Sequence, residues 1–74
     1  MNKFIETVCD MAKQDCVEVK ISNSEYLDAH IMLLNNGKKR CPVSVSDFEL
    51  EKSTDKELIA VAQARYRRAI TLMQ

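Results

Sequence analysis

The stretch Y-L-D-A-H-I-M-L-L-N-N-G, which covers residues 26–37, decides the fold because it allows two interpretations. As a helix, it would begin at a capping box formed by Ser22 and Glu25 and would end before Gly37. As a strand, it would send its odd-numbered side chains to one face and its even-numbered side chains to the other. The segments on either side favour the strand.

The segment before it, C-V-E-V-K-I-S at residues 16–22, alternates apolar and charged side chains, which is typical of a half-buried strand. A three-residue loop at residues 23–25 would pair this strand with the next one and keep the apolar side chains together. The predicted pairs on the inner face are Val17 with Ile31, Val19 with Ala29 and Ile21 with Leu27. The predicted pairs on the outer face are Glu18 with His30 and Lys20 with Asp28.

The segment after it supports the same interpretation. A three-residue Asn35–Gly37 loop, with its glycine in the left-handed conformation, would set Ile31 opposite Cys41 on the inner face. A two-residue turn would mix the two faces. The third strand, residues 39–46, contains Pro42, which cannot donate a backbone hydrogen bond, and we therefore expect this strand at an edge of the sheet.

Helices are predicted on both sides of the strands. Apolar side chains recur at helical spacing over residues 4–12, with Asn2 as the N-cap. Residues 54–57, T-D-K-E, form a capping box that opens the last helix after a connection at residues 47–52. The buried stripe of the last helix is predicted to contain Leu58, Ile59, Ala62, Tyr66, Ala69, Ile70 and Met73. The sequence thus predicts one α+β domain over residues 1–74, a two-layer sandwich whose three-stranded antiparallel meander carries the N- and C-terminal helices on one face.

The composition argues against several functional classes. The 74 residues carry 11 basic and 11 acidic side chains, so no net charge attracts nucleic acid or a membrane. No apolar run is long enough to cross a bilayer, and residues 1–6 carry charges where a secretory signal would be apolar. An odd number of cysteines without C-x₂-C spacing predicts neither a disulfide framework nor a zinc site. We expect a cytoplasmic protein without a membrane anchor, metal or cofactor.

Catalysis is not expected either. The single histidine, His30, would lie beside Glu18 on an open sheet face, with no nucleophile and no pocket nearby. The sequence also lacks a glycine-rich phosphate loop. We therefore predict a protein that acts by binding, with no catalytic residue.

The predicted element order, helix, three-stranded meander, helix, resembles the double-stranded RNA-binding domain over the whole chain. That family reads A-form RNA through the loop between its first two strands and a lysine cluster at the start of its last helix. Here the corresponding segments, N-S-E at residues 23–25 and S-T-D-K-E at residues 53–57, are neutral to acidic, and Glu49 and Glu51 precede the second one. The resemblance therefore implies the element order and transfers no RNA-binding residue.

Small size and compactness are also similar to those of phage-encoded inhibitors of bacterial defence, including anti-CRISPR proteins. The outer sheet face is the surface predicted to bind a partner, because apolar side chains stand there inside a charged rim. The predicted partner-binding residues are Tyr26, His30, Met32, Leu34, Lys38, Lys39 and Arg40. The predicted partner is a larger protein or nucleoprotein, in the host cytoplasm if the chain is phage-encoded.

Two alternatives use overlapping residues. In the first, the chain binds nucleic acid through the basic segment 38–40 together with Arg67 and Arg68 on the last helix. In the second, Tyr26, Met32 and Leu34 form the interface of a homodimer. The basic segments also have simple structural explanations. Residues 38–40 would protect an edge strand from further pairing, and Arg67 and Arg68 would compensate the dipole of the last helix. The acidic stretch at residues 47–57 is interpreted in the same way, as a solvated connection and a helix N-terminus.

Overall fold

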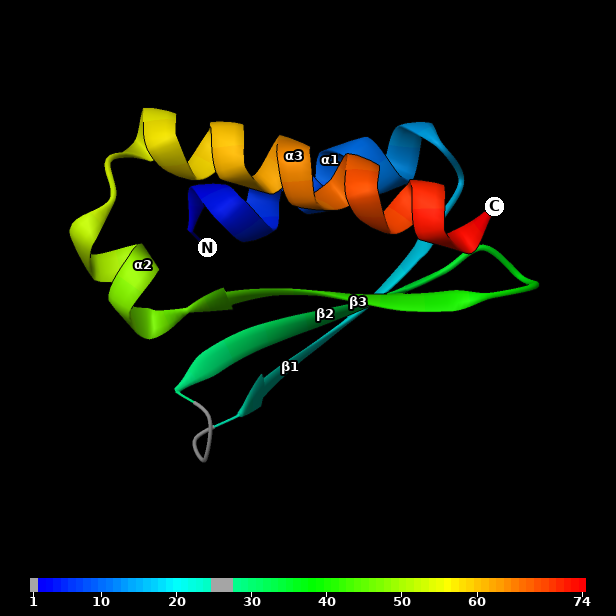
Figure 1. The fold of residues 1–74 in the computed structure, drawn as a ribbon, viewed down its shortest axis with the longest axis horizontal. Helices are drawn as coiled ribbons and strands as arrows, with labels where there is room; N and C mark the ends of the chain where they lie inside the picture. Colours follow the sequence, from blue (N-terminus) through cyan, green and yellow to red (C-terminus); the bar gives the residue numbers. More distant parts are fainter. Residues whose placement is uncertain (1, 25–27) are drawn as a thin grey trace.

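The computed structural model describes the backbone of residues 2–24 and 28–74 (Figure 1). It confirms the α+β fold, with a three-stranded antiparallel meander in the order β1-β2-β3. Helices α1 and α3 pack together on one side of the sheet, which gives two layers. The elements are α1 (Lys3–Gln14), β1 (Glu18–Ser24), β2 (Ala29–Asn35), β3 (Arg40–Ser46), α2 (Asp47–Lys52) and α3 (Asp55–Met73).

Helix α1 begins where the sequence predicts. The side-chain oxygen of Asn2 accepts a 2.8 Å hydrogen bond from the backbone N–H of Ile5, which satisfies one of the free N–H groups of the first turn. The helix is followed by a tight turn in which Cys16 has a φ of +58°. The N–H of Val17 donates to the carbonyl of Ala12 over 2.8 Å. This turn leads the chain directly into β1.

The predicted register between β1 and β2 is wrong. Strand β1 continues to Ser24, which pairs with Ala29, so residues 23 and 24 belong to the strand and not to a loop. The observed pairs include Glu18 with Asn35, Val19 with Leu34, Lys20 with Leu33 and Ile21 with Met32. The sequence predicts Leu27 as the partner of Ile21, but Leu27 lies outside the described residues. The observed partner of Ile21 is Met32, five positions further along the chain. The expected pairing of Glu18 with His30 and of Lys20 with Asp28 is not formed.

The register between β2 and β3 also differs from the prediction, because the loop is longer. Asn35 pairs with Arg40, which leaves the four residues 36–39 in the loop. The Asn35 side chain accepts a hydrogen bond from the N–H two residues ahead, over 2.8 Å. The Asn36 side chain accepts from the N–H groups two and three residues ahead, over 2.9 and 2.8 Å. These local bonds stabilise the four-residue loop and so fix the register.

Both register errors exchange the faces of β2. Ile31 lies opposite Ser44 and not opposite Cys41, a shift of three residues. Side chains alternate along a strand, so a shift by any odd number moves each one to the other face. Met32, opposite Val43, therefore points toward the helices, as does Leu34.

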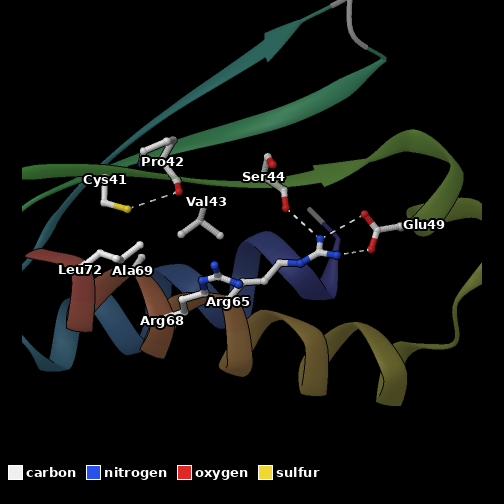
Figure 2. Close-up of a pocket in the computed structure, with 9 residues that line it drawn as sticks. All are labelled: Cys41, Pro42, Val43, Ser44, Glu49, Arg65, Arg68, Ala69 and Leu72. Atoms are coloured by element: carbon white, nitrogen blue, oxygen red, sulfur yellow. Dashed lines mark hydrogen bonds and ion pairs between the residues drawn. The ribbon is translucent and has the colours of Figure 1, made fainter.

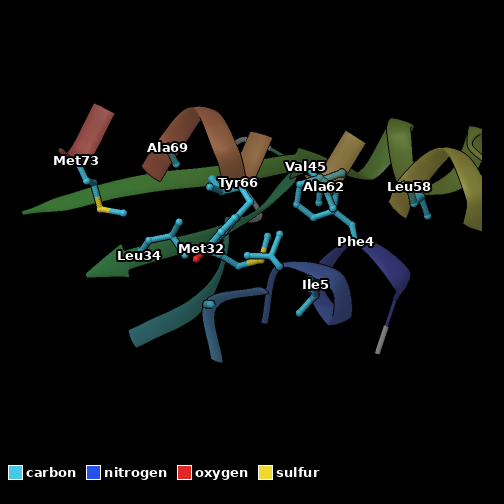
Figure 3. Close-up of a cluster of buried hydrophobic side chains, with 13 residues drawn as sticks. Phe4, Ile5, Met32, Leu34, Val45, Leu58, Ala62, Tyr66, Ala69 and Met73 are labelled. Carbon is cyan, nitrogen blue, oxygen red and sulfur yellow. The ribbon is translucent and has the colours of Figure 1, made fainter. Parts of the chain in front are cut away.

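The core lies between α1, α3 and the helix-covered face of the sheet (Figure 3). Met32 and Leu34 are both 0% exposed. Ile31 and Leu33, on the other face, are only partly buried. The buried core residues are Phe4, Ile5, Val8, Ala12, Met32, Leu34, Val43, Val45, Leu58, Ala62, Tyr66, Ala69 and Met73.

The chain after β3 forms two helices where one was predicted. The connection expected at residues 47–52 is the short helix α2, which opens with a capping box between Ser46 and Glu49. The capping box predicted for α3 is confirmed between Thr54 and Glu57. Five of the seven residues predicted for its buried stripe are buried, while Ile59 and Ile70 are only partly buried.

A pair of alanine substitutions tests the observed register. Met32→Ala removes a fully buried side chain and should lower the free energy of unfolding by about 2–5 kcal/mol. Leu33→Ala, at the next position but on the other face, should cost about 1 kcal/mol or less. Urea denaturation followed by circular dichroism measures both values. A larger loss for Leu33→Ala than for Met32→Ala would contradict the register.

Candidate interaction surfaces

The structure rearranges the predicted partner-binding residues. Met32 and Leu34 are core residues, so their assignment to the outer sheet face is wrong. His30 shares their face of β2, and its Nε2 lies 3.3 Å from Oδ1 of Asp47 in α2. Tyr26 lies outside the described residues. The homodimer interface predicted from Tyr26, Met32 and Leu34 therefore fails, because two of these side chains are inaccessible.

The sheet face that points away from α1 and α3 is called the open face (Figure 1). The register places a different apolar surface on it. Its centre is Ile31 and Leu33 of β2, both partly buried, and the exposed Pro42 of β3 lies opposite Leu33. We call these three residues the open-face patch. Polar and charged side chains surround it: Glu18, Lys20, Ser22, Asn35, Arg40 and Ser44.

The charged end of the open face is hollowed. A depression of about 460 Å³ is lined by Glu18, Val19, Lys20, Leu33, Asn35 and Arg40. Glu18 and Arg40 both lie opposite Asn35, from the two outer strands. Two cations and one anion thus stand beside the apolar patch. This end of the face can contact an acidic group of a partner while the patch contacts apolar side chains.

Three features block further strand pairing along the edge of β3 that faces away from β2, and Figure 2 shows Pro42 and Arg65, which belong to two of them. Pro42 has no N–H to donate. The guanidinium of Arg65 donates to the carbonyl of Ser44 over 2.9 Å and to both oxygens of Glu49 over 3.1 and 2.6 Å. The N–H of Ser46 donates to the same carboxylate over 3.2 Å. Another strand could not pair here without displacing Arg65 and Glu49.

Beside this blocked edge, a groove of about 280 Å³ separates β3 from α3 (Figure 2). Val43 and Ala69 are its buried apolar residues, and Leu72, which is 64% exposed, lies on its rim together with Arg68. Arg65 occupies one end through its bonds to Glu49. Sequence reasoning missed this groove because it depends on how α3 lies along β3.

The β2–β3 loop and the C-terminal end of α3 lie at the opposite end of the molecule from α2 (Figure 1), and the predicted basic residues belong to these two segments and to the start of β3. Nζ of Lys39 donates to the carbonyl of Gln74 over 3.4 Å, so the β2–β3 loop lies beside the end of α3. Lys38, Arg40, Arg67 and Arg68 are exposed. Successive helix residues differ by about 100° in direction, so Arg67 points away from the groove that Arg68 lines. The cluster is therefore divided between two surfaces.

Tyr66 and Cys9 are ionisable groups whose pKa is raised by burial and by neighbouring carboxylates within the fold. The hydroxyl of Tyr66 donates to Oδ2 of Asp15 over 2.6 Å, and burial together with this carboxylate raises the pKa of the tyrosine. Burial, with the nearby charge of Asp10, raises the pKa of the Cys9 thiol.

Within residues 2–24 and 28–74, all three cysteines are free and no group of three or more potential ligands is placed to hold a metal ion. None of the helices in this part of the chain combines the length and apolar character that crossing a membrane requires.

Comparisons with known proteins give no relatives. The chain matches no protein-family model, no curated protein and no solved structure.

The Arg65–Glu49 pair should make the stability of the fold depend on pH. Hydrogen bonds from Arg65, and then from Ser46, hold the pKa of Glu49 below its usual value. A lowered folded-state pKa stabilises the protein above the unfolded pKa, and this contribution is lost as the pH falls through the folded pKa. Glu49→Gln should cost about 1 kcal/mol at pH 7 and flatten the loss of stability between about pH 5 and pH 3. Urea midpoints across this range measure the effect, and a pH dependence equal to that of the unchanged protein would contradict it.

Proposed function

We propose that this chain is a non-enzymatic protein-binding module that docks through the open face. The observation that supports this proposal is the run Ile31-Met32-Leu33-Leu34, which makes both faces of the central strand apolar. A sheet with one face in water normally alternates apolar and polar side chains, whereas a strand covered on both faces is apolar throughout. The helices cover only the face of Met32 and Leu34. The other face is suited to a partner.

The rim of the open face indicates the chemistry of that partner. Lys20 and Arg40 flank Leu33 and Asn35, and among the residues that the structure describes Glu18 is the one acidic side chain on this part of the face. A matching surface would present an apolar projection to the patch and acidic groups to the two cations. More specifically, we propose that the partner is a host defence protein or nucleoprotein. This chain would inhibit it, as phage proteins of the anti-CRISPR kind do. The small size and compactness of the chain support that class.

Substitution of Ile31 by glutamate tests the proposed surface. The charge would stand at the centre of the patch, between Ser22 and Ser44, and should reduce partner capture at least about tenfold because burying an unpaired charge is costly. Leu72→Glu places the same charge on an exposed apolar side chain of α3, away from the open face, and should leave capture unchanged. The measurement is quantitative affinity purification with the three proteins, each shown to be folded by circular dichroism. Equal capture by Ile31→Glu and the unchanged protein would reject the open face.

Nucleic-acid binding is the second candidate, and the Lys39–Gln74 contact favours it by placing the basic loop beside the end of α3. The exposed residues Lys38, Arg40 and Arg68 would contact phosphates. A gel shift with double-stranded RNA or DNA should then weaken severalfold between low and physiological salt, and Lys38→Glu should abolish it. The absence of a shift at low salt would eliminate this candidate and leave the open-face proposal intact.

A further inference from the structure

The two edges of the sheet differ. The edge of β3 is blocked by Pro42, Arg65 and Glu49. Strand β1 pairs only with β2, so the backbone groups on its other side have no strand partner within the described sheet. Its apolar side chain Ile21 is 45% exposed although it points to the helix-covered face. An edge strand of seven residues with an exposed apolar side chain is suited to pairing with another strand.

We propose that β1 pairs with β1 of a second copy of this chain, antiparallel and about a two-fold axis perpendicular to the sheet. The two meanders then form one continuous six-stranded sheet, and backbone hydrogen bonds across the new junction join the edge groups of the two β1 strands, while the N–H of Val17, just before β1, keeps its bond to Ala12. This interface uses different residues from the homodimer that the sequence predicted.

The charges of β1 select the register of this pairing. If the axis passes beside Val19, then Glu18 of each copy lies opposite Lys20 of the other, which gives two favourable cross-strand pairs. If it passes beside Lys20, the two lysines lie opposite each other and repel. If it passes beside Ile21, Glu18 and Lys20 lie opposite serines. The first register is therefore favoured.

The same register covers the exposed apolar side chain. With Val19 opposite Val19 of the second copy, Ile21 lies opposite Val17 of the second copy. Val17 and Val19 already pack against the core from the helix-covered side. The pairing thus extends the apolar layer of each copy across the junction, and Ile21 becomes buried where it is now 45% exposed.

The dimer would enlarge the open face, a consequence that rests on the proposed function although the pairing itself does not. Three strands of seven residues give a flat area of roughly 300 Å² at ordinary strand spacing and rise. A two-fold axis perpendicular to the sheet places both open faces on the same side, which makes roughly 600 Å² available. This approaches the ~800 Å² that each partner contributes to a standard interface.

Sedimentation equilibrium of the full chain, from low to high micromolar concentration, tests the proposal. The expected result is a reversible monomer–dimer equilibrium. Glu18→Lys and Lys20→Glu should each weaken the dimer at least about tenfold, since each turns two attractive pairs into repulsive ones. The double variant, which exchanges the two charges, should restore it. Glu51→Lys makes the same charge change on the exposed side of α2 and should leave the dimer unchanged.

Two results would overturn the proposal: a monomer at every concentration, or a dimer whose dissociation constant is the same in Glu18→Lys and the unchanged protein. The outcome is independent of the proposed function. Ile31→Glu should lose the partner and keep the dimer, because Ile31 lies on β2 and not on the β1 edge. Loss of partner capture in Ile31→Glu, with no dimer in any variant, would reject this inference alone.

Discussion

The pairing of β2 with β3 determines the rest of this structure. Two asparagine side chains close the loop at residues 36–39, and the four-residue loop sets Met32 opposite Val43. This register sends Met32 and Leu34 into the core and leaves Ile31 and Leu33 on the open face. A shift of one residue would exchange the two pairs and change both what the helices pack against and what a partner would meet.

The sequence predicted the elements and the faces of β1 and β3 well, but it assigned the two faces of β2 wrongly. The first and last helices follow from apolar spacing and capping residues, and the edge position of β3 follows from Pro42. The register could not be predicted by matching apolar faces, because the run at residues 31–34 is apolar on both sides of the strand. Either the odd-numbered or the even-numbered side chains of this run could therefore face the helices. The short helix α2 was missed although Ser46 and Glu49 have the spacing of a capping box.

The candidate site moved for the same reason. The expected apolar stripe inside a charged rim exists on the outer sheet face, but it consists of Ile31, Leu33 and Pro42. Of the residues first assigned to it, Arg40 remains on this face, while His30 turns toward Asp47 in α2. The protection of the β3 edge by Arg65 could not be foreseen, because it joins residues from β3, α2 and α3. Together these features give the sheet one covered face, one open face, one blocked edge and one open edge.

The register of β2 against β3 is the claim on which the open-face proposal depends, and nuclear magnetic resonance measures it directly. Backbone protons of residues that lie opposite each other in an antiparallel pair are close enough to give nuclear Overhauser effects. The structure predicts such an effect between Ile31 and Ser44. An effect between Ile31 and Cys41 in its place would mean that the other face of β2 is buried, and it would contradict the account.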